Sequence, residues 1–158
     1  MEKYIEAFID VCRKVFLSMG NISINAENPF IMGKDMISNW DLSTIIGLSG
    51  DARGAIAISM RNDTALRMTS ALTGNQQSDI TDEVIDIVGE IINIIAGQAK
   101  QRMESEYNLQ ISLPIVTRGP GHILSWPGKN PRVICIPFKV FEKDVFYFLA
   151  SVEPNITM

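Results

Sequence analysis

The helical pattern of residues 82–106 sets the strongest limit on the fold, because its apolar side is too broad to stay in water. At about 100° per residue, one wide face collects apolar side chains. These are Val84, Ile87, Val88, Ile91, Ile92, Ile94, Ile95 and Ala99. A face of this width is well suited to packing on a sheet. Asp82 and Glu83 stand in the first turn, where the helix dipole favours negative charge.

The opposite side of this helix carries a narrow polar ridge. Asp86, Glu90, Asn93 and Gly97 fall within an arc of roughly 60°. A solvated helix face is the simplest interpretation, and the ridge taken alone favours it. Two features argue against it, because asparagine forms helices poorly and glycine costs about 1 kcal/mol relative to alanine inside a helix. A glycine beside an asparagine indicates a place that another molecule approaches closely.

The rest of the chain alternates between helical and strand patterns. Further helices are predicted over residues 2–19 and from Asn62 or Asp63, as the capping residue, to Leu72. Strands are predicted over residues 21–31, 40–48, 54–60, 109–117, 133–140 and 146–152. Short turns between successive strands favour an α+β fold, in which long helices pack on an antiparallel sheet.

Both halves of the chain contain a long helix and a later hairpin, which suggests an internal duplication without a residue-level repeat. No stretch rich in proline, glycine and serine divides the halves. We therefore expect residues 1–158 to form a single domain.

Composition excludes several classes of protein. The chain has 158 residues, of which 46% are hydrophobic and 20% charged, so it can bury a core. The net charge of −4 argues against a general nucleic-acid binder. No segment reaches the roughly 18 uninterrupted apolar residues of a membrane span, and the acidic N-terminus does not resemble a secretory signal. We expect no membrane association and a cytoplasmic location.

Metal and nucleophile chemistry have little support in the sequence. Cys12 and Cys135 are far apart and fit buried small side chains, while His122 is the only histidine. A zinc site or a Ser-His-Asp triad is therefore unsupported. We expect His122 on a surface loop.

The polar ridge is chemically incomplete by itself. An amide is neither a general acid nor a general base near neutral pH, but it donates one hydrogen bond and accepts another. This suits the orientation of a water molecule, as a glutamine does in some phosphoryl hydrolases. The ridge lacks a nucleophile–base pair, a metal cage and a phosphate cradle. We infer that a partner would supply the missing groups.

The ridge also resembles a known signature. The string DIVGEIINIIAG, from Asp86 to Gly97, is similar to that of the CheC/CheX/FliY chemotaxis phosphatases: an acid or serine, three residues, then ExxN. The likeness extends to GLSGDARGAIAISM, TALRMTSALTG, ISLPIVTRG and the last pair of strands, which begins IPF. CheC and FliY carry two ExxN sites, whereas residues 2–19 have none, so the chain resembles the CheX type.

The resemblance implies a CheC-like fold and an activity. Family members hydrolyse the aspartyl phosphate of the response regulator CheY. By this likeness, Asn93 would orient the attacking water and Glu90 would pair with the active-site lysine of the partner. Asp86 and Gly97 would belong to the docking surface. The chain itself would bind no cofactor, and Mg²⁺ would sit on the response regulator. A homodimer is also implied, for which an exposed strand edge would serve.

A non-catalytic binding module is the alternative. Such a protein would sequester a phosphorylated response regulator or act as an adaptor at the flagellar switch. The presence of both Glu90 and Asn93 favours the enzyme, because a pure docking surface needs no amide at that position.

Overall fold

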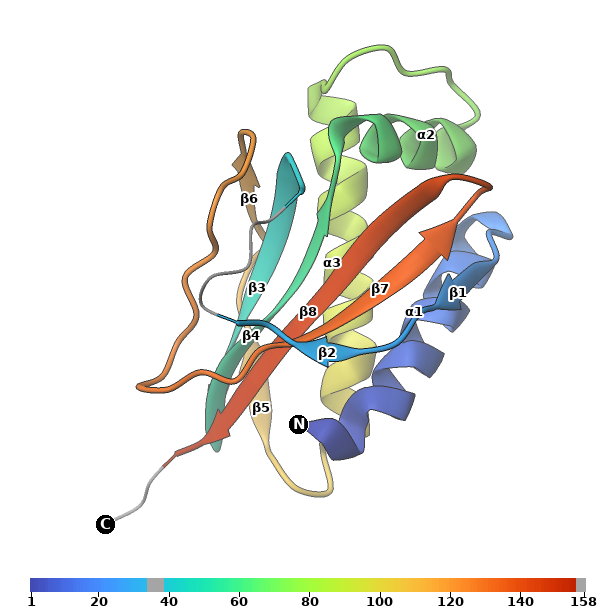
Figure 1. The fold of residues 1–158 in the computed structure, drawn as a ribbon. Helices are drawn as coiled ribbons and strands as arrows, with labels where there is room; N and C mark the ends of the chain where they lie inside the picture. Colours follow the sequence, from blue (N-terminus) through green and yellow to red (C-terminus); the bar gives the residue numbers. More distant parts are fainter. Residues whose placement is uncertain (34–38, 156–158) are drawn as a thin grey trace.

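The computed structural model describes residues 1–33 and 39–155. In chain order, the elements are η1 (Glu2–Tyr4), α1 (Ile5–Gly20), β1 (Ile24–Ala26), β2 (Phe30–Ile31), β3 (Leu42–Gly50), β4 (Ala52–Met60), α2 (Asn62–Thr73), α3 (Asp82–Arg102), β5 (Leu109–Ile111), β6 (Ile115–Arg118), β7 (Ile134–Val140) and β8 (Asp144–Pro154). Figure 1 shows α1 and α3 on one face of a twisted sheet, with α2 at one end of α3.

The strands form one sheet in the order β1-β7-β8-β4-β3-β5, with β2 on β7 and β6 on β3. All the strand pairs that the structure describes are antiparallel. The predicted α+β architecture is confirmed. The central strand β4 is buried along nearly its whole length, because helices cover one of its faces and a loop covers part of the other.

The helices bury the main core against the sheet. Aromatic side chains join the layers, since Phe8 and Phe16 of α1 pack against Phe148 and Phe146 with ring centroids 5.2 and 5.0 Å apart. Three methionines of this core are fully buried, namely Met60, Met68 and Met103. Cys12 and Cys135 are buried as well, and burial raises the pKa of the Cys135 thiol to about 12. Both cysteines therefore act as small apolar side chains.

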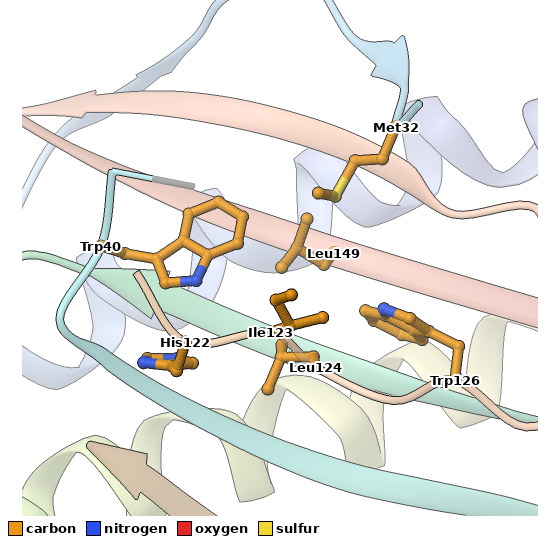
Figure 2. A pocket seen from close by; sticks show the side chains of 7 residues that line it. All are labelled: Met32, Trp40, His122, Ile123, Leu124, Trp126 and Leu149. Carbon is orange, nitrogen blue, oxygen red and sulfur yellow. The ribbon is translucent and has the colours of Figure 1, made fainter. Parts of the chain in front are cut away.

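The other face of the sheet carries a second, smaller cluster. Trp40, Leu149 and Trp126 meet there, and they line part of a small cavity of about 60 Å³ (Figure 2). Trp126 comes from the long loop between β6 and β7, which covers this face as an aromatic lid.

His122 lies in the same loop and corrects one prediction. It is partly buried, not a free surface residue, because it ties the loop to the sheet. Nδ1 lies 2.7 Å from the Gly119 carbonyl, which can only accept, so Nδ1 donates this hydrogen bond. Nε2 lies 2.6 Å from the Ser43 hydroxyl, and Ser43 is in turn 2.6 Å from Ser59. These bonds satisfy polar groups under the loop.

The strand order contains an internal symmetry. If α1, β1, β2, β3 and β4 are exchanged with α3, β5, β6, β7 and β8, the order of the sheet is reproduced in reverse. The pairing of β2 with β7 becomes that of β6 with β3, and both are observed. Among the described elements, α2 and the short η1 have no separate counterpart. The suggested duplication is therefore present in the topology, although the residues show no repeat.

Several predicted boundaries are wrong, and the strand predicted over residues 21–31 is the two short strands β1 and β2. Helix α2 begins with Arg61 as its N-cap residue, and no side chain of its own caps it. Instead, the Asn62 backbone N–H donates to Asp41 at 3.0 Å. Helix α3 ends at Arg102, not at residue 106, where tight turns follow. The strand predicted over residues 109–117 is two short strands, because Pro114 has no N–H to continue the ladder.

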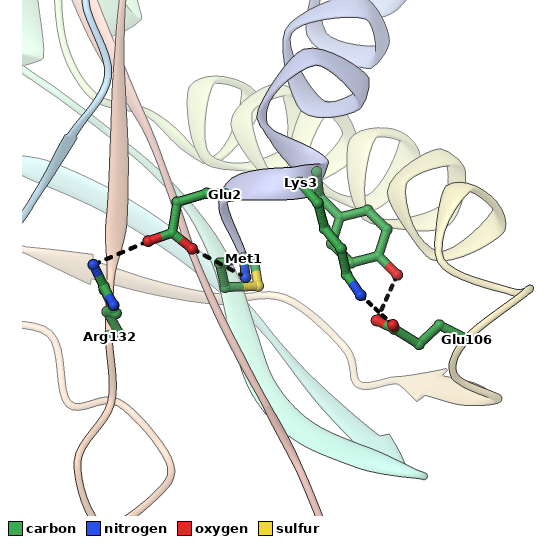
Figure 3. A network of polar contacts seen from close by, with 6 residues as sticks. Met1, Glu2, Lys3, Glu106 and Arg132 are labelled. Atoms are coloured by element: carbon green, nitrogen blue, oxygen red, sulfur yellow. Dashed lines mark hydrogen bonds and ion pairs between the residues drawn. The ribbon is translucent and has the colours of Figure 1, made fainter.

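Ion pairs hold α1 against the C-terminal end of α3. Lys3 pairs with Glu106 (Figure 3). Tyr4 donates a hydrogen bond to the same carboxylate at 2.8 Å, and Arg102 pairs with Asp10. The hydrogen bond from Lys3 lowers the pKa of Glu106, while burial and the Glu106 contact raise the pKa of Tyr4 to about 12. Each exposed pair contributes little energy, and the pairs link residues that the antiparallel setting of the two helices brings together.

Candidate functional site

The polar ridge of α3 faces outward, as the helical pattern predicts. Asp86, Glu90 and Asn93 are exposed, and Gly97 is half-buried. The opposite side of the helix is buried, including Val88, Ile91, Ile92 and Ile95. This side packs on β3 and on the β5–β6 segment, with α1 and α2 alongside. A rigid, well-packed helix therefore holds the ridge in place.

The ridge side chains have no partners of their own. Within residues 1–33 and 39–155, neither Asp86, Glu90 nor Asn93 makes a side-chain hydrogen bond or an ion pair. The carboxylate of Asp144, in contrast, is fully engaged. It accepts hydrogen bonds from Thr64 at 2.9 Å and from Arg67 at 2.6 and 2.5 Å. Arg67 lowers the pKa of the Asp144 carboxyl. The carboxylate and the amide of the ridge remain available to another molecule.

The N-terminal half of α3 is strongly acidic. Asp82, Glu83, Asp86 and Glu90 are all exposed within its first three turns, while Lys100 and Arg102 lie in the last turn. The two acids of the first turn stabilise the helix through its dipole. Asp86 and Glu90 lie further along, where this effect has faded. Their charge therefore suits a cationic group on whatever docks there.

Two glycines shape the surface around Asn93. Gly97, one turn further along, has nothing within 4 Å of the position where a Cβ would stand. Gly97 therefore borders open space and makes no close contact inside the described part of this chain. Gly89, one turn before Asn93, is buried against Pro114, whose Cγ lies 3.8 Å from the position of a Cβ. The β5–β6 linker therefore flanks the ridge on the Asn93 side.

The symmetry-related helix α1 carries different groups. Its buried positions repeat those of α3 at an offset of 80 residues, since Phe8, Ile9, Val11, Cys12, Val15 and Phe16 correspond to Val88, Gly89, Ile91, Ile92, Ile95 and Ala96. Asp10 and Arg13 then occupy the positions of Glu90 and Asn93. Asp10 is already paired, with Lys14 at 3.0 Å and with Arg102. The ridge of α3 has no second version on α1.

The ridge of α3 combines two polar groups that the described part of the chain leaves free. A free amide and a free carboxylate project from a rigid helix, and no nucleophile with its base stands beside them in the described part of the chain. The same part holds no group of three or more metal-binding side chains. No helix in it combines the length and the apolar character needed to cross a bilayer. Both ridge side chains are therefore open to contact with another molecule.

Comparisons with known proteins identify the family. The family model described as chemotaxis phosphatase CheX matches residues 42–139, more than half of the chain. The chain belongs to the CheX family of chemotaxis phosphatases. The predictions of a CheX-type protein and of an enzyme of the phosphoaspartate phosphatase class are confirmed.

Individual relatives agree with this. A curated CheY-P phosphatase CheX of Thermotoga maritima is 28% identical over 114 residues, which cover 71% of this chain and 72% of that protein. The solved structure of the chemotaxis protein CheX from Vibrio vulnificus is similar at a TM-score of 0.84 and 27% identity, over 96% of this chain and 99% of that one. A CheX-CheY-BeF3-Mg²⁺ complex from Borrelia burgdorferi is similar at a TM-score of 0.79 and 25% identity, over 95% and 97% of the two chains.

Proposed function

We propose that this chain hydrolyses the aspartyl phosphate of a CheY-type response regulator, with Asn93 and Glu90 as its catalytic residues. The observation that carries the proposal is the outward position of these two side chains, which no described residue of the chain engages. The Borrelia burgdorferi complex supports the choice of partner, since it joins a CheX to a CheY with BeF3 and Mg²⁺. The reaction would take place in the cytoplasm.

Asn93 orients the attacking water in this proposal. Its carboxamide accepts a hydrogen bond from the water and directs the oxygen in line with the phosphorus. The oxygen bonds to phosphorus, the bond from phosphorus to the aspartyl oxygen breaks, and inorganic phosphate and a free aspartate remain. Mg²⁺ bound to the partner, together with the partner's lysine, would stabilise the charge on the phosphoryl group. This chain supplies positioning, for which one rigidly held amide is sufficient.

Glu90 pairs with the active-site lysine of the response regulator. It lies one turn of helix before Asn93, so a single docking geometry places both side chains. Asp86, a turn earlier still, extends the acidic surface and supports docking. Gly97 leaves room for the partner beyond Asn93.

Turnover distinguishes catalysis from sequestration. CheY-type response regulators phosphorylated with a small acyl phosphate donor are mixed with this chain at a ratio of about one to a hundred, and phosphate release is followed. We expect many regulators to be dephosphorylated per molecule of this chain. Protection of the phosphate, or acceleration only near equal concentrations, would show a binding module and reject the enzyme.

A methyl group at Gly97 should separate stability from activity. Gly97→Ala adds a side chain where nothing in the chain lies within 4 Å. Alanine is the better helix former, so the free energy of unfolding should rise by about 1 kcal/mol in denaturant titration. The kcat/KM for the response regulator should fall severalfold, because the methyl group fills space that the partner uses. A more stable variant of unchanged activity would remove Gly97 from the docking surface.

A homodimer remains a prediction. The described sheet has two open edges, β1 with β2 on one side and β5 with β6 on the other. A second copy could add to either edge by antiparallel pairing.

A further inference from the structure

The ridge is too small to recognise a protein alone. It consists of four positions on one helix, whereas even transient protein interfaces bury several hundred square ångströms on each partner. A response regulator that contacts Glu90 and Asn93 must also contact the surface that flanks them. On the Asn93 side, that flank is the linker between β5 and β6, which packs at Gly89.

Leu113 stands in this linker and is 85% exposed. Scattered exposed leucines are common and need no explanation. Leu113 differs because both of its neighbours are anchored. Ser112 exchanges hydrogen bonds with Gly47, whose N–H donates to Oγ at 2.8 Å and whose carbonyl accepts from the Ser112 N–H at 3.0 Å. Pro114 packs against α3 at Gly89. The exposed side chain is therefore presented on a fixed backbone.

Leu113 directly precedes Pro114, which packs at Gly89, so its backbone lies close to the ridge. Gly89 and Asn93 are four residues apart, so they are neighbours on α3, about 40° apart around its axis. The next exposed apolar residue of the segment, Ile115, belongs to the other face of the sheet. Ile115 stands opposite Ile45, and Ile45 packs with the cluster under the loop between β6 and β7.

We propose that Leu113 is an apolar anchor for the response regulator, inserted beside the acyl phosphate while Glu90 and Asn93 enter the active site. This inference rests on the proposed function and adds a specificity-determining contact to it. The polar ridge provides charge and chemistry but buries little apolar area. A leucine held on a fixed backbone buries apolar area while little conformational entropy is lost on binding, as is the case for hot-spot residues. The partner surface that fits it is an apolar patch next to the phosphorylated aspartate.

The test measures binding and turnover of Leu113→Ser. We expect its Kd for the BeF3⁻-activated response regulator, and its KM in dephosphorylation, to rise about tenfold, because the variant buries no apolar side chain. The kcat should stay within about twofold, because Asn93 and Glu90 are untouched. Ile123→Ser is the matched control, since Ile123 is 92% exposed but lies at the cavity on the opposite face of the sheet. It should behave like the unaltered chain.

Other outcomes are equally informative. If the unaltered chain turns over, Asn93→Ala does not, and Leu113→Ser keeps the normal Kd and KM, this inference fails and the proposed function stands. If Leu113→Ser lowers the molar mass in light scattering, Leu113 belongs to a contact between copies and the proposal is overturned. If the unaltered chain dephosphorylates no regulator, the proposed function fails and this inference with it. Circular dichroism confirms that each variant is folded.

Discussion

Replacing Asn93 with alanine is expected to slow dephosphorylation of the response regulator about 10²-fold, the cost of losing one positioned polar group in a transition state. The side chain is exposed and has no partner within the described residues, so its removal should leave the stability of the chain nearly unchanged. The loss should fall on kcat, with the Kd for the BeF3⁻-activated regulator within about threefold, because only the geometry of the attacking water is lost. Single-turnover phosphate release measures the first quantity and fluorescence titration the second.

Gln101→Ala provides the control for this experiment. Gln101 is another exposed amide on α3, two turns beyond Asn93 and close to the C-terminal end of the helix. It should be as active as the unaltered chain. Full activity of Asn93→Ala would contradict the assignment of the water-orienting role. A loss confined to binding would move Asn93 from catalysis to docking.

Removing the charge of Glu90 is expected to have the next largest effect. Glu90→Gln keeps the size of the side chain but cannot form an ion pair with the lysine of the partner. We expect kcat/KM to fall about 30-fold, because truncating one side of a charge pair that is buried in a complex costs 2–5 kcal/mol. Unlike the loss in Asn93→Ala, much of this loss should appear in KM, since the pair holds the complex together.

Salt dependence provides a second readout for Glu90. The KM of the unaltered chain should rise with ionic strength, and that of Glu90→Gln should rise less steeply, because one screened attraction is missing. Glu104→Gln is the control, since Glu104 is exposed after the end of α3 and away from the ridge. If both variants lose the same activity, the effect comes from net charge and not from a pair at Glu90.

The ridge could be predicted from the sequence because its geometry is local. A helix fixes the angle between residues, so the spacing of Asp86, Glu90, Asn93 and Gly97 is sufficient to place them on one face. The hydrophobic positions opposite them settle which face is outward. The proposed reaction of this ridge comes from the family resemblance. The roles of Glu90 and Asn93 remain predictions.

The errors arose where distant residues decide local structure. The start of α2 depends on Asp41, which comes from before β3, and the partial burial of His122 depends on Ser43. Neither partner is near in sequence. The exposure of Leu113 was missed for the same reason. The sequence ISLPIV is typical of one buried strand, and the contact between Pro114 and Gly89 is seen only in the structure. A proline inside that apolar run was the available signal for an interruption.

The swapped symmetry of the sheet has a consequence for stoichiometry. Two helices share one scaffold and one burial pattern, yet only α3 projects a free carboxylate and amide, whereas the matching acid of α1 is held in ion pairs. On the proposed assignment of Glu90 and Asn93, each polypeptide carries one reactive ridge, although the sheet offers two equivalent helix positions. Two such ridges would then require two polypeptides.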